Sequence, residues 1–424
     1  MLCLFIIIVI FVTSLVLSKR IVHPVTILSL VWSIIMGLYQ LNISSFNDIS
    51  ANTYFIIGSG IVAFSVGFSV FKATIRDKRI VIGNFRALKE NEELYEEHIK
   101  YGVVGFLCIS SIIVLLPEAI NSLKILASGG TFETLRTNYS SGYSVLNISI
   151  LSLYRNYIVK PFCYIIYPLC AIDFIKGEKK RWLFICTFVL AFLSTLYEGG
   201  RVQFVYLAMH FALIFILAGY QINIPKKVKR ILVGLIILMA FVVWYITTLR
   251  GSSSTFSQSI LLYVSGCVPL LDSHLKSLHF HPKYTYGLVA ISGFLKPFFS
   301  LLENVGIPYP AFLTNIQHVF EVEQSISIGL GFHMNAYVSI FYYSFYDGGY
   351  IGNVIEMFLY GGLAWLIYIR ATSKRGMLYY ALFFQGLVFS MIRFQFTISH
   401  YCLAFIMAYF LFEKVLTLDY EGKL

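Results

Sequence analysis

The chain has 424 residues, of which 58% are hydrophobic and only 12% are charged, and its net charge is +11. Its mean hydropathy of +0.77 excludes a soluble globular protein, in which roughly a quarter of the residues are charged. The basic residues form no continuous stripe and accompany no nucleic-acid-binding motif, so we exclude nucleic acid as a partner and regard the charge as a match for anionic membrane lipid.

Apolar runs alternate with clusters of basic residues along the whole chain. A hydrocarbon core of about 30 Å needs roughly 17 to 25 apolar residues per helix, and runs near this length occur eleven times. The expected spans are Leu2–Leu17, Ile21–Leu41, Tyr54–Phe71, Tyr101–Leu116, Tyr157–Ile175, Trp182–Tyr197, Val202–Tyr220, Ile231–Thr248, Tyr350–Ile369, Met377–Ile392 and Ile398–Phe412. We therefore expect an all-α polytopic membrane protein in which residues 1–424 form a single integral membrane domain.

The basic residues also predict the orientation of the spans. Alternate connecting segments hold 22 of the 32 lysines and arginines, and the other 10 are spread over the opposite, longer connections. By the positive-inside rule the first set is cytoplasmic, so the N-terminus faces out and the C-terminus faces in. The first run has no basic region before it and no small-residue cleavage site, so we expect a retained helix and not a cleaved signal peptide.

Three connections are longer than a simple turn. A cytoplasmic loop, 72–100, mixes basic residues with glutamates and is expected to contain a solvated helix. An external loop covers 117–156, and a large external, periplasmic loop covers 249–349. A loop of that last length usually has a function of its own.

Two apolar stretches lie inside the large external loop. Ser259–Leu271 is too short to span, and Tyr286–Leu302 is interrupted by Gly293, Lys296 and Pro297. This pattern favours helices that lie at the membrane interface or re-enter it, and the alternative is two further spans.

Charged residues at membrane depth are costly and mark candidate functional sites. The sequence Glu198-Gly-Gly-Arg201 is the whole outer connection between two spans, and Glu198 lies about 25 Å along a helix from Arg181. Its two glycines permit positive φ and expose backbone N–H groups. This turn could bind a phosphate, or it could simply close the hairpin with an ion pair.

Three further places carry charge at the expected outer surface. Arg393 divides a long apolar run, and Arg250 follows the eighth span. Asp347 precedes the ninth span, with Glu356 about 13 Å beyond it if that helix is regular from its start. A single interfacial arginine is more often a lipid anchor, but Arg201, Arg250 and Arg393 are expected on one side at one depth. Together they favour an anion site, because the guanidinium fork suits phosphate oxygens.

Five short motifs surround the large external loop in a distinctive order. They are Gly199-Gly-Arg201, Leu249-Arg-Gly251, Leu270-Leu-Asp272, Asn335-Ala-Tyr337 and Asp347-Gly-Gly-Tyr-Ile-Gly352. In overall plan and in these motifs the chain resembles the O-antigen polymerase (Wzy) family of bacterial oligosaccharide repeat-unit polymerases. The resemblance implies a C-type glycosyltransferase fold in the bacterial inner membrane, acting on undecaprenyl-diphosphate-linked oligosaccharide at the external face, beside a flippase and a chain-length regulator.

The chemistry implied by this resemblance assigns provisional roles to outer residues. Negative charge would develop on a leaving diphosphate, and positioned arginines could stabilise it without a metal. The residues expected to bind the diphosphate are Arg201, Arg250, Arg393 and Arg136. The candidates for the general base are Asp272 and Asp347, followed by Glu198 and His274. Tyr337 and Asn335 are expected at the sugar.

No cofactor and no metal is expected, because the sequence has no Asp-x-Asp and its seven cysteines lack zinc-type spacing. Three other functions remain open. An O-antigen ligase would share the loop and the arginines, and a flippase or secondary transporter would show two matching halves with polar residues at mid-membrane. A non-catalytic scaffold or receptor would use the loop only to bind a partner.

Overall fold

The fold was determined as a computed structural model of the whole chain. It describes residues 1–41, 46–81, 95–143, 149–219, 230, 233–234, 237, 241, 244, 256–276, 284–308, 310–311, 326–329, 331–334 and 337–416. The expected eighth span, Ile231–Thr248, falls mostly outside the described residues. Arg250 and Asn335, two of the expected site residues, lie outside them as well.

Six helices are long and apolar enough to cross a membrane, judged by length and composition. They are Ala51–Ile75, Tyr101–Ala127, Ile150–Lys176, Arg181–Glu198, Val202–Gly219 and Ser339–Tyr368. Three shorter apolar helices are Leu2–Ser18, Pro24–Gln40 and Ser399–Phe410. The chain thus has the helical architecture of a multi-pass membrane protein, and each of these helices coincides with one of the expected runs.

The chain packs into two compact units. Unit 1 comprises Met1–Phe71, Ser252–Tyr368 and Phe383–Leu403. Unit 2 comprises Lys72–Gly251, Ile369–Leu382 and Ala404–Leu424. Each unit draws on segments far apart in sequence, and each is described by itself below.

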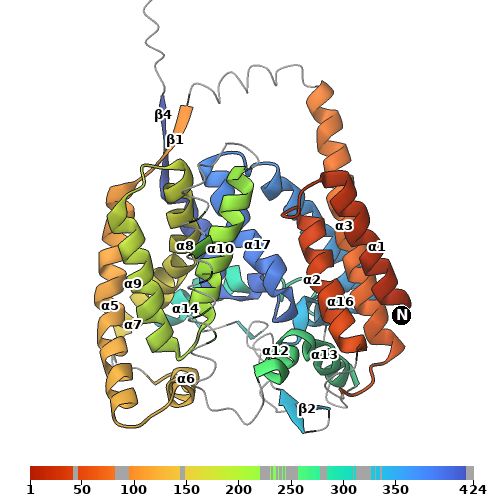
Figure 1. Cartoon of the computed structure of the whole chain (residues 1–424), viewed down its shortest axis with the longest axis horizontal. Coiled ribbons are helices and arrows are strands. Elements are labelled where there is room, and N and C mark those ends of the chain that lie inside the picture. Colours follow the sequence, from red (N-terminus) through yellow and green to blue (C-terminus); the bar gives the residue numbers. More distant parts are fainter. Residues whose placement is uncertain are drawn as a thin grey trace, which may run out of the picture. The chain divides into compact units, whose positions relative to one another are not determined.

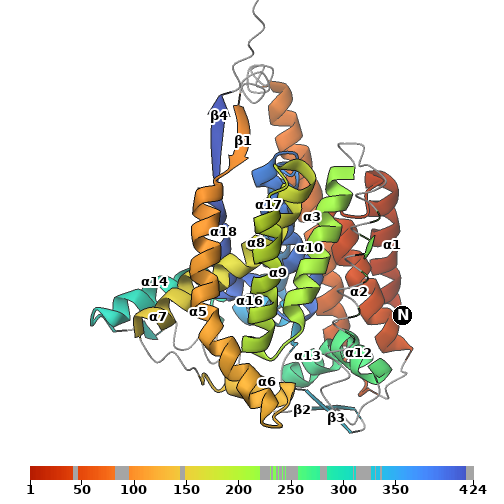
Figure 2. The same cartoon turned by 60° about the vertical axis from the view of Figure 1, so that its left-hand side comes forward.

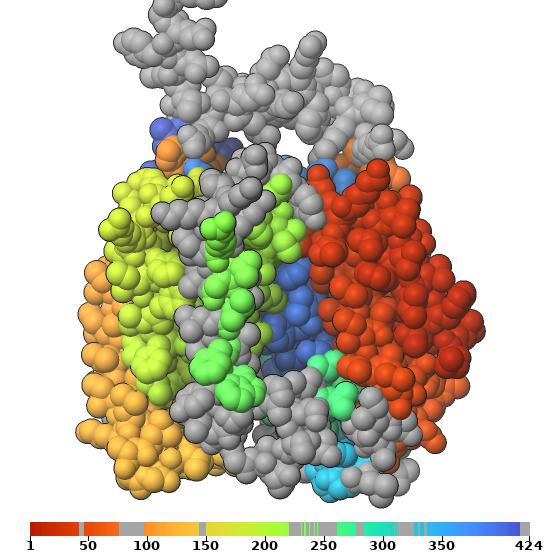
Figure 3. All heavy atoms as spheres, viewed as in Figure 1, coloured from red at the N-terminus to blue at the C-terminus, as the bar shows by residue number. Residues whose placement is uncertain are grey.

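Unit 1 begins with two helices packed side by side. Helix α1 (Leu2–Ser18) lies along α2 (Pro24–Gln40) in both views (Figures 1 and 2). The Ser14 and Thr26 hydroxyl oxygens, 2.7 Å apart, join the two helices. On its other side α1 exposes apolar side chains, in the red surface of Figure 3. That side suits contact with hydrocarbon.

Two longer helices of the chain approach each other through glycines in unit 1. They are α3 (Ala51–Val81) and α16 (Ser339–Tyr368). A Cβ on Gly67 would lie 2.0 Å from the Phe358 carbonyl oxygen, and a Cβ on Gly361 would lie 2.0 Å from the Phe64 carbonyl oxygen. Small residues let membrane helices pack with their backbones close together, and both positions require it here.

Helix α16 is not regular from its start. It begins at Ser339, earlier than the expected Tyr350, and its backbone leaves the helical conformation at Gly348 and Gly349. The helix is thus not regular between Asp347 and Glu356, so the condition under which we expected them about 13 Å apart is not met.

The described part of the expected external loop 249–349 is largely short helices. They are α12 (Phe256–Ser265), α13 (Cys267–Lys276) and α14 (Ser292–Asn304), followed by the antiparallel strands β2 (Ile326–Gly329) and β3 (Phe332–Met334). None of these three helices is among the candidate spans of the described residues. This goes against the alternative of two further spans.

Unit 2 is built around a group of helices that follow one another in the chain. In chain order they are α5 (Tyr101–Ala127), α6 (Phe132–Ser140), α7 (Ser149–Tyr154), the π-helix η1 (Arg155–Val159), α8 (Lys160–Lys176), α9 (Arg181–Glu198) and α10 (Val202–Gly219). Helix α5 packs on α9, and α8 packs on α10. The expected external loop 117–156 is too long at both ends, because α5 continues through Pro117 and the next span begins at Ile150.

The other helices and strands of the chain are short or lie near its C-terminal end. They are β1 (Tyr95–Ile99), α17 (Lys374–Val388), the 3-10 turns η2 (Phe389–Met391) and η3 (Gln395–Thr397), α18 (Ser399–Phe410) and β4 (Phe412–Leu416). Strands β1 and β4 pair antiparallel in unit 2, where the Arg375 N–H donates to Glu97 Oε2 over 2.8 Å. The expected cytoplasmic loop 72–100 is therefore shorter than predicted, because α3 enters it and β1 ends it.

Candidate functional site

The turn between α9 and α10 is part of a cluster of polar and charged side chains in unit 2. Helix α9 ends at Glu198 and α10 begins at Val202, so Glu198-Gly-Gly-Arg201 is the whole connection, as the sequence predicted. Gly199 has φ 59° and ψ 26°, and the N–H of Gly200 donates to the Thr195 carbonyl oxygen over 3.2 Å. The positive φ expected of this turn is thus confirmed at Gly199.

Helix α6 packs directly onto this turn. A Cβ on Gly199 would lie 2.5 Å from the backbone nitrogen of Arg136, so only glycine fits between the turn and α6. Thr131 caps the start of α6, and Leu135 is buried beneath it. This docking brings Arg136 within electrostatic range of Glu198.

A tyrosine of α6 contacts two cations. The Arg136 guanidinium lies 5.8 Å from the centre of the Tyr139 ring, and the Lys160 ammonium lies 5.4 Å from it. The ring also packs edge-on against Tyr197, with centroids 5.1 Å apart. Burial, helped by the nearby Glu198 charge, raises the pKa of the Tyr139 hydroxyl well above its usual value, so the hydroxyl stays protonated and the ring carries no charge.

Glu198 is held by a chain of hydrogen bonds from the two spans behind it. Gln203 Nε2 donates to Glu198 Oε2 over 2.8 Å, and the Tyr167 hydroxyl donates to Gln203 Oε1 over 2.9 Å. The charge of Lys160 also acts on Glu198. The carboxylate is therefore fixed in orientation, a property that a general base requires.

A buried ion pair lies next to the cluster. Arg155, the first residue of the π-helix, donates to Glu118 Oε1 over 2.8 Å, and both side chains are buried. The Arg155 guanidinium also lies 5.2 Å from the centre of the Tyr197 ring. π-Helical turns are rare and often occur at functional sites, and this one sets Arg155 and Lys160 five residues apart in chain on the same cluster.

The cluster carries more positive than negative charge. Glu118 is matched by Arg155, which leaves Arg136 and Lys160 around Glu198, with Arg201 in the adjoining turn. Such an arrangement, at the ends of apolar helices, can bind an anion through the cations and accept a proton on the carboxylate. Of the expected residues, the structure thus brings together Arg136, Glu198 and, through the turn, Arg201.

Asp272, an expected base, caps another helix of unit 1. Its Oδ1 accepts hydrogen bonds from Ser50 N (2.8 Å), Ser50 Oγ (2.6 Å) and Thr53 Oγ1 (2.7 Å) just at the start of α3. Its Oδ2 lies 2.5 Å from Lys276 Nζ. Burial alone would raise the pKa of Asp272, but the hydrogen bonds from Lys276, Ser50 and Thr53 lower it below its usual value.

Asp347, the other leading base, fixes the chain that leads into α14. Its Oδ1 accepts from the Thr285 hydroxyl and from Val289 N (3.0 Å), and its Oδ2 accepts from Ala290 N (2.9 Å). Each carboxylate oxygen already has a partner, so Asp347 stabilises this turn. Glu198 differs from both aspartates, because the hydrogen bond from Gln203 reaches one of its oxygens, Oε2.

The other expected residues of unit 1 each have contacts of their own. His274 of α13 packs against the Tyr342 ring with centroids 5.5 Å apart, and burial lowers its pKa to about 4. Tyr337 has φ 74° and packs edge-on against Tyr263, 5.5 Å between centroids. Arg393 lies between η2 and η3, where its charge acts on Lys296 of α14.

Sequence reasoning missed five members of the unit 2 cluster: Glu118, Tyr139, Arg155, Lys160 and Gln203. Lys160 carried the clearest signal, because it is a charge inside the expected span Tyr157–Ile175, the very feature that marks a functional site. Glu118 follows Pro117, where we expected the helix to have ended. Tyr139 gave no signal, because its contacts with Lys160 and Tyr197 join residues distant in the chain.

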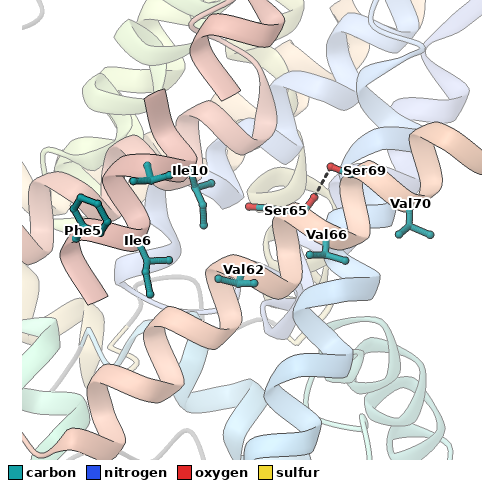
Figure 4. A pocket seen from close by; sticks show the side chains of 9 residues that line it. Phe5, Ile6, Ile10, Val62, Ser65, Val66, Ser69 and Val70 are labelled. Carbon is teal, nitrogen blue, oxygen red and sulfur yellow. Dashed lines mark hydrogen bonds between the residues drawn. The ribbon is translucent and has the colours of Figure 1, made fainter. Parts of the chain in front are cut away.

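A groove in unit 1 has a different character. It lies between α1 and α3 and has a volume of about 430 Å³ (Figure 4). Its walls are aliphatic and aromatic except for Ser65 and Ser69, whose hydroxyls donate to carbonyls of their own helix. It offers a surface for hydrocarbon and no group that could act on a bond. Among the described residues, no three histidine, cysteine, aspartate or glutamate side chains gather as a metal site.

Comparisons with protein-family models, with curated proteins and with solved structures find no match to this chain.

Proposed function

We propose that the chain polymerises polyprenyl-diphosphate-linked oligosaccharide repeat units into O-antigen or another surface polysaccharide. The observation that carries this proposal is the unit 2 cluster, in which Arg136 and Lys160 flank an oriented Glu198 at the end of two apolar spans. The donor of such a reaction presents a diphosphate at the membrane surface, and the acceptor presents a hydroxyl. The cations of the cluster can bind the diphosphate, and Glu198 can accept the proton of the hydroxyl.

In the proposed topology the chain crosses the bacterial inner membrane eleven times, with its N-terminus outside and its C-terminus inside. The cluster would then lie at the external face, beyond the outer end of α9. The orientation rests on the distribution of basic residues between the connections.

The proposed reaction is one glycosyl transfer. An acceptor hydroxyl oxygen forms a bond to the anomeric carbon of the donor, and the bond from that carbon to the diphosphate oxygen breaks. The diphosphate leaves with the electron pair, and Arg136, Lys160 and Arg201 stabilise its growing charge. Glu198 accepts the proton of the acceptor hydroxyl, and Gln203 holds it in position.

An O-antigen ligase is the second candidate, because it would use the same leaving group and the same two kinds of side chain. It differs in the acceptor, which the cluster does not specify. A transporter is less well supported, since the oriented carboxylate lies at the end of a span and not midway along it.

The test is the surface polysaccharide profile of cells in which the gene is deleted and then replaced by variants. We would compare wild type with Lys160→Gln, Arg136→Gln, Glu198→Gln and Arg201→Ala. Lys124→Gln, an exposed cation of the same unit, is the matched control. Immunoblots of membranes would confirm equal amounts of each protein.

A polymerase predicts that deletion leaves a single repeat unit and that wild type and Lys124→Gln restore the ladder. Glu198→Gln should lose about 100-fold or more of the activity, the usual contribution of a general base. Long polymer that stays on its lipid carrier would instead indicate the ligase. An unchanged profile after deletion would contradict both enzymes.

A further inference from the structure

Helix α14 and the residues at its two ends present one side of exposed apolar side chains, here called the α14 stripe. Ile291, Phe294, Phe298, Leu301 and Val305 recur at spacings of three and four residues, and all are exposed, Phe298 to 58% and Val305 to 73%. This spacing places them on one side of a helix. An exposed apolar patch of this kind marks a surface that another molecule covers.

The opposite side of α14 packs tightly against η3 and α18. A Cβ on Gly293 would lie 2.3 Å from the Phe396 carbonyl oxygen and 2.6 Å from Cys402 Sγ, so only glycine allows this approach. Gly293 and Pro297 are both buried. The inner side of α14 is therefore fixed by the protein, and the stripe faces away from this contact.

The charged residues of α14 lie away from the stripe. The helix has one lysine, Lys296, and one glutamate, Glu303, and each lies roughly 140–160° around the helix axis from Phe298. Glu303 is exposed, whereas Lys296 is half-buried. Burial, together with the Arg393 charge, lowers the pKa of Lys296 to about 8, in agreement with a place on the inner side. The stripe itself carries no charge, so hydrocarbon matches it better than a polar surface does.

Two exposed tyrosines precede the stripe. Tyr284 is 46% exposed and Tyr286 is 86% exposed. The N–H of Tyr286, which has φ 50°, donates to the Asp347 carbonyl oxygen over 2.9 Å, and the Asp347 carboxylate accepts from Val289 N and Ala290 N. These bonds fix the turn that presents Tyr286. Tyrosine rings gather at the headgroup level of membranes, so this pair indicates an interface beside the stripe.

The length of α14 excludes a membrane span. Its 13 residues, Ser292–Asn304, cover about 20 Å, whereas the hydrocarbon core is about 30 Å thick. The six candidate spans of the described residues nevertheless provide the chain with a membrane. A helix too short to cross, with one uncharged apolar side, suits a position parallel to the membrane surface.

We infer that α14 lies in the membrane interface with its stripe inserted among lipid acyl chains, and that this contact does not require anionic headgroups. The partner is thus a lipid surface that is recognised through its hydrocarbon. Interfacial helices that depend on anionic lipid present lysines and arginines on their water-facing side, whereas the one lysine of α14 lies on the side held by the protein. The inference does not depend on the proposed polymerisation.

The test is photo-crosslinking of the full-length protein in phosphatidylcholine nanodiscs. Benzoylphenylalanine, which inserts into nearby C–H bonds, would replace Phe298 in one sample and Glu303 in a matched control. We expect phospholipid adducts by mass spectrometry at position 298 in about tenfold or greater excess over position 303, because only the stripe meets acyl chains. Equal adducts at both positions, or none at position 298, would overturn the inference.

Two other results of the same experiment are decisive. A crosslinked dimer at position 298 without lipid adducts would show that a second copy of the chain covers the stripe, against the inference. Addition of phosphatidylglycerol to the nanodiscs should leave the yield of adducts at position 298 within about twofold. A rise of about tenfold would show instead that anionic headgroups recruit the helix.

A second readout uses stability in the same nanodiscs. Phe298→Asp places a carboxylate among acyl chains and should lower the melting temperature, whereas Phe298→Leu keeps an apolar side chain there and should melt close to wild type. A stripe that faced water would tolerate both substitutions, as exposed positions usually do. Equal melting temperatures of the two variants would therefore contradict the insertion of the stripe.

Discussion

At the scale of single residues, the three leading candidates for the general base have different surroundings. Asp272 and Asp347 have their oxygens occupied by neighbouring backbone and side-chain donors. Glu198 is held at one oxygen by Gln203 and lies among cations. Because of this difference, Glu198 is the better candidate for the general base.

The Gln203 link should therefore be valuable for stability. Gln203→Leu leaves Glu198 Oε2 and the Tyr167 hydroxyl without their present partners, and we expect a loss of about 1–3 kcal/mol in the free energy of unfolding. Tyr167→Phe removes only the outer bond and should cost less. Thermal unfolding in detergent would measure both, and equal stability of Gln203→Leu and wild type would refute the assigned role.

Lys296 should make stability depend on pH. Its pKa is about 8 in the folded protein and near 10.5 when it is unfolded and exposed. Between these values the unfolded chain holds a proton that the folded chain does not, so the free energy of unfolding rises with pH. Below about pH 8 both states are protonated, and the full penalty of burying the charge applies.

We expect this rise in wild type when unfolding is compared at about pH 7.5 and about pH 9.5. Lys296→Gln should lack it, and the difference between the two proteins cancels the titration of other groups. Identical pH dependence in both would contradict the burial of Lys296.

At the scale of helices and turns, some features were predictable from the sequence and others were not. The turn at Glu198 to Arg201 was predictable because two adjacent glycines between apolar runs admit few conformations. The continuation of α5 through Pro117 was not, because a proline costs one helical hydrogen bond and packing on α9 outweighs it. The helical turns from Ser339 to the break at Gly348 and Gly349 were also missed, because we expected the ninth span to begin only at Tyr350.

The two glycines of the α9–α10 turn offer a matched comparison. Gly199→Ala places a Cβ 2.5 Å from the Arg136 backbone nitrogen at a positive φ, and we expect a loss of about 1–3 kcal/mol with α6 displaced. Gly200→Ala meets its nearest atom at 3.8 Å and should be tolerated. Limited proteolysis and thermal unfolding would report both, and equal effects would disprove the docking of α6.

At the scale of the whole molecule, hydropathy predicted the class of the protein and the place of nearly every described apolar helix. Composition could not predict which residues meet, because the unit 2 cluster joins residues as distant as Glu118 and Gln203. The candidate site was therefore half predicted. Glu198 and Arg201 came from charge at membrane depth and Arg136 from the expected diphosphate ligands, whereas their neighbours are brought there by packing.

The proposed orientation predicts opposite exposure of two connections of unit 2. Ser128→Cys, after α5, should react with a membrane-impermeant maleimide on intact cells. Glu178→Cys, before α9, should react only after lysis. Six of the seven native cysteines are buried and form a low background. Labelling of Glu178→Cys on intact cells would reverse the proposed topology.

Helix α14 also has a consequence for the membrane itself. Because its phenylalanines and its lysine lie on opposite faces of one short helix, the depth at which the helix rests in the lipid also sets the height of Lys296. Bilayer thickness would thus set the height of this ammonium relative to the lipid headgroups. A membrane that is thicker or thinner by a few ångströms would place Lys296 at a different level among them, without any change in the protein.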